Sequence, residues 1–207
     1  MKKTKVAFFD FACCEGCQLQ VANIGELLLD VLDKIELVNF REVMSERSDD
    51  YDVAVVEGSI TDRHAVERIK KIRSIAKVVI AYGSCATIGG VNGMKNNFNL
   101  DDIRKSVYGK QAEYFDTIPT RAVHQVVKVD YFVHGCPVYI PEFVKVLKCA
   151  LSGTPYRVPD HSVCVECKLN ENVCMYDRGV SCLGPVTRAG CNSWCINNGN
   201  ICYGCRG

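Results

Sequence analysis

The sequence lacks the features that would place it in a membrane or on a nucleic acid. No run of 18 or more apolar residues occurs among its 207 residues, so no helix is expected to span a bilayer. Lysine and arginine number 25 against 24 acidic residues, and a net charge of +1 favours neither nucleic acid nor an anionic membrane as a partner. The apolar run from Val6 stops at Asp10, too early for a signal-peptide core. We therefore expect a cytoplasmic protein without a membrane anchor.

Motifs that bind phosphates or dinucleotides are also missing. No Gly-x-Gly-x-x-Gly motif opens a helix after the first predicted strand, and the glycines at 83 and at 89–90 do not form one. The sequence holds no phosphate loop, flavin-binding motif or nickel site. We therefore expect that the chain itself makes and breaks no bonds in a substrate.

Cysteine is abundant instead. The chain has 14 cysteines, and eight of them lie between Cys164 and Cys205. In a reducing cytosol such cysteines are metal ligands more often than disulfide partners. The cysteine content therefore predicts metal centres.

The first three quarters of the chain follow an α/β pattern. Buried strands are predicted at 5–11, 36–40, 51–56, 77–82 and 129–133, and helices at 18–34, 62–75 (with Thr61 as the N-cap) and 141–151 (opened by Pro141). Alternating strands and helices predict a flavodoxin-like, doubly wound parallel sheet with the strand order 2-1-3-4-5. The long link over 83–128 predicts extra elements or a functional loop.

The pattern stops near Pro155 and Pro159, which predicts two domains, 1–155 and 156–207. The second has few apolar residues and no clear periodicity. Such a segment buries too little surface to fold alone, so bound metal is expected to stabilise it.

Cysteines follow three of the predicted strands. Cys13, Cys14 and Cys17 follow the first strand, Cys85 the fourth and Cys136 the fifth. Because ligands gather at the carboxyl ends of parallel strands, four of these thiolates are expected to form a cage for one iron–sulfur cluster. Taken singly, Cys85 and Cys136 also fit ordinary buried thiols.

The last eight cysteines divide into two sites of four, with a Cys-x-x-Cys pair at each end: Cys164-x2-Cys167-x6-Cys174-x7-Cys182-x8-Cys191-x3-Cys195-x6-Cys202-x2-Cys205. Four-cysteine sites hold zinc as well as iron–sulfur clusters. The spacing alone leaves both open.

Short motifs along almost the whole chain resemble the small subunit of [NiFe] hydrogenases, most closely the cytoplasmic type of sulfhydrogenases and of bidirectional or bifurcating complexes. The matching stretches, in the family's order, are Cys14-Glu15-Gly16-Cys17-Gln18, Val56-Glu57-Gly58, Gly83-Ser84-Cys85-Ala86, Gly135-Cys136-Pro137, Cys164-Val165-Glu166-Cys167-Lys168, the run from Cys182 to Cys191, and Cys202-Tyr203-Gly204-Cys205.

The resemblance implies three [4Fe–4S] clusters. It assigns the proximal cluster to Cys14, Cys17, Cys85 and Cys136, the distal cluster to Cys164, Cys167, Cys174 and Cys182, and the medial cluster to Cys191, Cys195, Cys202 and Cys205. Periplasmic relatives have a histidine at the place of Cys164 and a proline at that of Cys195. The cysteine at 195 indicates a four-iron medial cluster.

Two cysteines remain. Cys149 lies opposite the apolar face of its predicted helix and is interpreted as a bystander or interface thiol. Adjacent Cys13 and Cys14 resemble the related subunit of respiratory complex I, in which both neighbours bind the cluster. The Cys14–Cys17 pair is the preferred interpretation here, with a Cys13–Cys14 pair as the alternative.

Three other side chains lie near the predicted proximal site. Glu15 and Glu57 are suited either to relay protons toward a neighbouring subunit or to cap loop N–H groups. His134 is suited to hydrogen-bond a cluster sulfur, or else to lie in solvent.

The resemblance implies a relay of electrons between the nickel–iron site of a large subunit and a partner subunit that carries flavin or further iron–sulfur clusters. Two rival functions stay open: a complex-I-like electron carrier with one cluster, and a zinc-stabilised interaction module.

Overall fold

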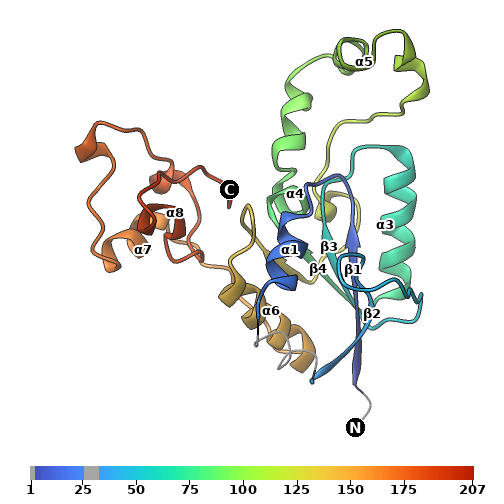
Figure 1. Cartoon of the computed structure of the whole chain (residues 1–207), viewed down its shortest axis with the longest axis horizontal. Helices are drawn as coiled ribbons and strands as arrows, with labels where there is room; N and C mark the ends of the chain where they lie inside the picture. Colours follow the sequence, from blue (N-terminus) through green and yellow to red (C-terminus); the bar gives the residue numbers. More distant parts are fainter. Residues whose placement is uncertain (1–2, 26–32) are drawn as a thin grey trace.

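The computed structural model describes residues 3–25 and 33–207 and contains a five-stranded sheet. Figure 1 shows how the helices are arranged around it. Its strands are β1 (Thr4–Asp10), β2 (Ile35–Asn39), β3 (Val53–Glu57), β4 (Val78–Tyr82) and β5 (Tyr131–Val133). Every neighbouring pair is parallel, and the order is β2-β1-β3-β4-β5. The predicted order and all five predicted strands are therefore confirmed, although β5 is shorter than expected.

Helices α1 (Gly16–Ala22), α3 (Arg63–Ile75) and α6 (Ile140–Ser152) cover the sheet, and α6 has proline in its first turn as predicted. The helix predicted over 18–34 begins at Gly16 and ends at Ala22, and positions 26–32 lie outside the described residues. The predicted cap of α3 is wrong by one position. Asp62 is the N-cap, because its carboxylate accepts the backbone N–H of Ala65 at 2.8 Å.

The long link between β4 and β5 contains structure of its own. It folds into α4 (Ser84–Ile88), α5 (Leu100–Tyr108) and the 3₁₀ turns η1 (Val91–Asn97), η2 (Gly109–Tyr114) and η3 (Val123–Gln125). The part around α5 projects beyond the sheet (Figure 1). The prediction of extra elements in this link is thus confirmed.

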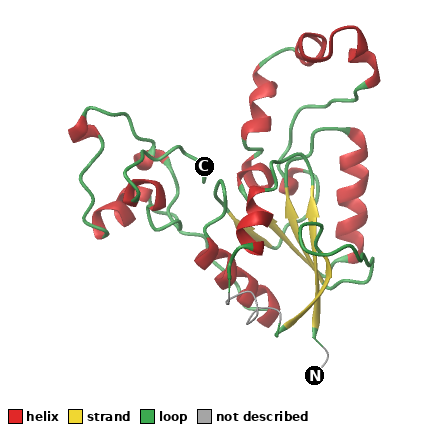
Figure 2. Ribbon diagram, in the orientation of Figure 1, coloured by secondary structure: helices red, strands yellow, loops and turns green. Residues whose placement is uncertain are grey.

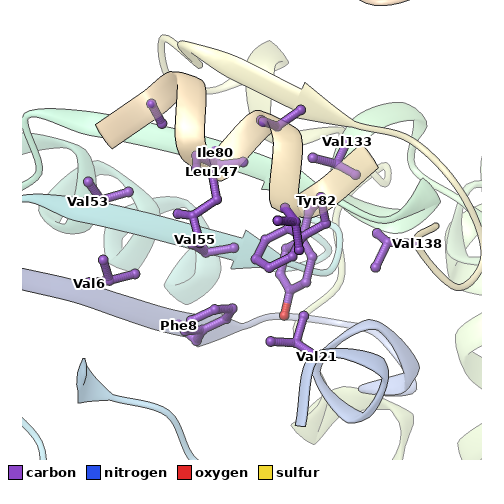
Figure 3. Packing of buried hydrophobic residues seen from close by; sticks show 14 of the residues in the cluster. Val6, Phe8, Val21, Val53, Val55, Ile80, Tyr82, Val133, Val138 and Leu147 are labelled. Atoms are coloured by element: carbon purple, nitrogen blue, oxygen red, sulfur yellow. The ribbon is translucent and has the colours of Figure 1, made fainter. Parts of the chain in front are cut away.

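Helices cover both faces of the sheet (Figure 2), and the buried residues form two layers, one on each face. Along β3, Val53 and Val55 point to the face covered by α1 and α6, whereas Ala54 and Val56 point to α3. This alternation explains why the strand is apolar at every position. Figure 3 shows the first layer, in which Leu147 of α6 lies over the sheet residues.

The C-terminal region lies beside the sheet, next to α6 (Figure 1). It contains α7 (Val163–Leu169), α8 (Trp194–Asn197) and the turns η4 (Tyr176–Arg178) and η5 (Gly184–Val186). Its small buried cluster consists of Val163, Cys167, Met175, Cys182, Ile196 and Cys202. Half of this cluster is cysteine, as expected of a region with little apolar surface to bury. No helix within the described residues is long and apolar enough to cross a membrane.

Candidate metal centres

Four cysteine thiols meet at the carboxyl edge of the sheet. Cys14 and Cys17 follow β1, Cys85 follows β4 and Cys136 follows β5, and together they line a cavity of about 320 Å³. We call them the first cysteine set. Cys14 and Cys136 are exposed, so this cavity opens to the surface. Segments more than a hundred residues apart therefore converge here, as the strand-end argument predicts.

Glu57 sets the place where α1 begins. Its buried carboxylate at the end of β3 accepts the backbone N–H groups of Cys17 at 3.1 Å and Gln18 at 3.0 Å. A carboxylate at a helix N-terminus satisfies N–H groups that lack helical partners and interacts favourably with the helix dipole. Burial raises the pKa of Glu57, and the two N–H bonds oppose that shift. The structure thus gives Glu57 a capping role, and the proton relay stays a prediction.

Glu15 is held differently. It immediately precedes α1 in a left-handed conformation, and its side chain pairs with Arg41, which also binds Asp10 at 3.2 Å. These groups lie at the surface beside the first cysteine set. The carboxylate therefore already has a cation as partner.

Glycines let the backbone approach the thiols closely. A Cβ on Gly83, whose φ is +84°, would lie 2.6 Å from the sulfur of Cys17. A Cβ on Gly90, whose φ is +55°, would lie 2.8 Å from the sulfur of Cys85. Both positions need glycine for its conformation and for the space it leaves beside the sulfur atoms.

The electrostatics of the first set suit a positively charged group. Burial raises the pKa of Cys17 strongly, with the nearby Glu57 carboxylate adding to the shift, and burial raises the pKa of Cys85 to about 11. Iron in the cavity would supply the positive charge that keeps such thiols deprotonated. The donor set, the cavity and the glycines therefore fit an iron–sulfur cluster.

Cys13 lies apart from this cavity. It is absent from the residues that line it, and burial raises its thiol pKa to about 12. Cys14 and Cys17 both line the cavity. The geometry therefore supports the preferred Cys14–Cys17 pair over the adjacent pair, and the ligand assignment stays a proposal.

The second cysteine set consists of Cys164, Cys167, Cys174 and Cys182. Burial raises the pKa of Cys167, and the other three thiols of the set raise it further, so the four lie near one another. A Cβ on Gly184 would lie 3.3 Å from the sulfur of Cys164 and 3.5 Å from that of Cys182. The first turn of α7 and the loop after it therefore surround one site.

The third cysteine set consists of Cys191, Cys195, Cys202 and Cys205. Burial raises the pKa of Cys205 to about 11, and the other three thiols add to the shift. Glu166 of α7 fixes the first of the loops involved, because its carboxylate accepts the N–H groups of Gly190 at 2.8 Å and Ser193 at 3.1 Å. The structure thus places near one another the members of each set that the resemblance implies, and it also brings Cys182 of the second set next to Cys202 of the third.

Within residues 3–25 and 33–207, no three His, Cys, Asp or Glu side chains are arranged to hold a single metal ion. A structural zinc site would require thiols at about 2.3 Å from one ion. The first cysteine set lines a cavity of about 320 Å³, and this room suits a cluster better than a single zinc ion.

Comparison with known proteins agrees with this geometry. Residues 14–150 match the family described as NADH ubiquinone oxidoreductase, 20 Kd subunit. The delta chain of sulfhydrogenase 2 from Pyrococcus furiosus is 35% identical over 98% of this chain and 86% of its own length. The chain belongs to this family, as a hydrogenase small subunit. It is therefore a component of an oxidoreductase complex.

Further relatives support the assignment. A component of the F420-non-reducing hydrogenase vhu from Methanocaldococcus jannaschii is 30% identical over 98% of this chain and 81% of its own length. The delta chain of the NAD-reducing hydrogenase HoxS from Cupriavidus necator is 31% identical over 76% of this chain and 83% of its own. A [NiFeSe] hydrogenase structure from Desulfomicrobium baculatum covers all of this chain, and the chain covers 95% of it, with 18% identity and a TM-score of 0.72. That likeness concerns the fold.

In this small subunit His134 is buried, so the alternative that placed it in solvent is wrong. Its Nε2 lies 3.3 Å from a guanidinium nitrogen of Arg188, and its Nδ1 has no partner among the described protein atoms. Burial, together with the charges of Arg206 and Arg188, lowers the pKa of His134 to about 4. The ring is therefore neutral at physiological pH.

A buried ion pair in the structure has no signal in the sequence. The guanidinium of Arg206, which is 0% exposed, binds both carboxylate oxygens of Glu142 on α6, at 2.6 and 2.8 Å. Arg206 directly follows Cys205, and no local motif marks its partner 64 positions away. The first turn of α6 contains a proline and Glu142, and this pattern does not predict that the Glu142 carboxylate is buried.

Proposed function

We propose that this small subunit relays electrons through three [4Fe–4S] clusters, held by the first, second and third cysteine sets. An iron–sulfur cluster supplies reversible one-electron exchange. The chain's own part is to hold the clusters in line, to restrict water around them and to adjust their potentials through burial and hydrogen bonds to sulfur.

The observation that carries the proposal is the spatial order of the three sets. Cys136 of the first set lines a second cavity, of about 440 Å³, together with Cys191, Cys195 and Cys205 of the third set. The backbone N–H of Cys202 in the third set donates to the sulfur of Cys182 in the second set at 3.3 Å. The third set therefore lies between the other two, which supports a proximal, medial and distal order.

Exposure and the family support one orientation of the relay in the complex. The first set opens to the surface at the sheet edge, which supports its placement against the nickel–iron site of the large subunit. The second set lies at the other end and would face a partner subunit that carries flavin or iron–sulfur clusters. Relatives named as NAD-reducing and F420-non-reducing hydrogenases indicate that such acceptors differ within the family.

We further infer that residues 1–155 and 156–207 form two domains, the second stabilised by its clusters. The fourteen free thiols, none of them in a disulfide, suit the reducing cytoplasm.

The test is to measure iron, acid-labile sulfide and zinc, with the visible spectrum, on the anaerobically purified complex with its large subunit. We expect about 12 iron and 12 sulfide atoms per small subunit, because each of three clusters holds four of each. About four iron atoms would instead support the complex-I-like carrier, which the name of the matching family also suggests. Two zinc ions with little iron would support the interaction module.

A further inference from the structure

The guanidinium of Arg206 donates hydrogen bonds to several partners. Besides Glu142, it donates from one guanidinium nitrogen to the carbonyl oxygen of His134 at 2.6 Å, and from Nε to the carbonyl oxygens of Arg188 at 3.1 Å and Ala189 at 2.9 Å. Its single side chain therefore joins three segments: the end of β5, the start of α6 and the loop before Cys191. Each of these segments leads into or out of a cysteine set.

The carboxylate of Glu142 is also held by several contacts. It is buried, and Oε1, one of the two oxygens bound by Arg206, also accepts the hydroxyl of Tyr156 at 2.9 Å. A side chain at Gly190 would collide with the guanidinium and with the Glu142 carboxylate, so glycine keeps this space open. A planar guanidinium with several donors suits such a site, and lysine would not reproduce its geometry.

The loop that carries Cys205 is also tied to the first cysteine set. The hydroxyl of buried Ser84, the neighbour of Cys85, donates to the carbonyl oxygen of Cys205. The backbone N–H of Cys136 faces the sulfur of Cys205. Ligand loops of two proposed clusters are thus in direct contact.

Buried ion pairs contribute weakly to stability compared with apolar packing, and their better-attested effect is to fix one arrangement among several. The Arg206–Glu142 pair lies where the sheet region meets the C-terminal region, close to Cys136 and Cys205. This position suits a role in fixing the arrangement of the two loops more than a role in the overall stability of the fold.

We propose that Arg206 is a positioning residue whose ion pair with Glu142 holds the Cys205 loop against the Cys136 loop, and so fixes the separation of the proximal and medial centres. This inference rests on the proposed three-cluster relay. Because electron tunnelling and magnetic coupling both fall steeply with distance, a small displacement of one loop would change both.

The test uses the complete, anaerobically purified complex with Arg206→Gln and Arg206→Lys. Electron paramagnetic resonance of the reduced complex reports the splitting caused by coupling between neighbouring reduced clusters. We expect the proximal–medial splitting to be lost in Arg206→Gln and partly retained in Arg206→Lys, with iron content unchanged in both. Ser84→Ala removes only the hydroxyl contact with Cys205 and should weaken the splitting without loss of iron.

A control is available at the amino end of β5. Arg73 also pairs with a carboxylate, Asp130 at 2.6 Å, and donates to the carbonyl oxygens of Ala76 and Lys77. Arg73→Gln removes an ion pair that is more exposed than Arg206–Glu142 and that involves no residue of the cysteine sets. We expect it to lower stability while leaving the splitting unchanged.

A second measurement does not depend on cluster signals. Hydrogen exchange of peptides covering 198–207 should accelerate in Arg206→Gln and Glu142→Gln and stay slow in Arg73→Gln.

The outcomes separate the two proposals. Wild-type splitting in Arg206→Gln, with full iron content, would overturn the positioning role and leave the relay intact. If Arg206→Gln loses iron, the other two variants decide. An unchanged splitting in both Arg206→Lys and Ser84→Ala would then overturn the positioning role. A wild-type complex without iron would overturn the relay, and the positioning role with it.

Discussion

The sheet region and the C-terminal region of this small subunit are stabilised in different ways. The sheet region buries two continuous apolar layers, one on each face of the sheet. The buried cluster of the C-terminal region has six members, and three of them are cysteines. The first region therefore has a large apolar core, whereas the second has little apolar surface to bury, and we propose that metal bound by its cysteines makes up the difference.

Removing iron is expected to give the largest difference in stability between the two regions. We expect anaerobic chelation under mild acid to unfold residues 156–207 while β1, β3 and β4 stay folded, because metal binding supplies folding free energy to sites with little apolar core. Hydrogen exchange of the complex before and after iron removal measures this directly. Retained protection around α7 and α8 would mean that the C-terminal region has an apolar core of its own.

Loss of one ligand should remove one cluster. Cys174→Ser is expected to lower the iron content from about 12 to about 8 atoms per chain, because a four-iron cluster needs its four thiolates. Cys149→Ser is the matched control, since this thiol is similarly half-buried but lies on α6 outside all three sets. An equal loss of iron in both variants would contradict the assignment of the second set.

A core substitution should act on the sheet region alone. Phe143→Ala removes a buried ring that packs against Phe8 and Tyr82, and it is expected to lower the free energy of unfolding by about 3–5 kcal/mol. Phe98→Ala, at a side chain 66% exposed, should change it by less than about 0.5 kcal/mol. Denaturant titration, monitored by exchange of the β3 and β4 peptides, distinguishes these results. Comparable losses would show that packing does not explain the stability of this region.

The smallest expected difference between the two regions is in the stability that the N-cap side chain gives to a helix. Asp62→Ala should destabilise α3 by about 1 kcal/mol, because its carboxylate caps the helix N-terminus. Ser162→Ala should have almost no effect, since the Ser162 side chain makes no capping hydrogen bond at the start of α7. Thermal melting of the two variants compares them, and an equal shift would refute the distinction.

The features that the sequence predicts correctly are those that short-range patterns determine. The apolar runs of β1, β3 and β4 identify a sheet covered on both faces, and chain connectivity then restricts the strand order. The convergence of Cys14, Cys17, Cys85 and Cys136 follows from their places after the strands. These predictions need only spacing and topology.

The remaining features depend on partners far along the chain. The start of α1 is set by the carboxylate of Glu57, forty residues beyond Cys17, so helical periodicity places it wrongly. Thr61 and Asp62 are both suitable caps, and only the geometry at Ala65 decides between them. The Arg206–Glu142 pair has no local signal, because its partners meet only when the C-terminal region packs on α6.

The spacing of the cysteines along the chain has a consequence for the order of maturation. Members of the second set lie within about twenty residues of one another, whereas the first set is complete only when the loop after β5 reaches the loop after β1. Closing the shorter loops loses less chain entropy. On the proposed assignment, the second set is able to bind its cluster on a partly folded chain. The first set can bind its cluster only after β1, β4 and β5 have taken their places in the sheet.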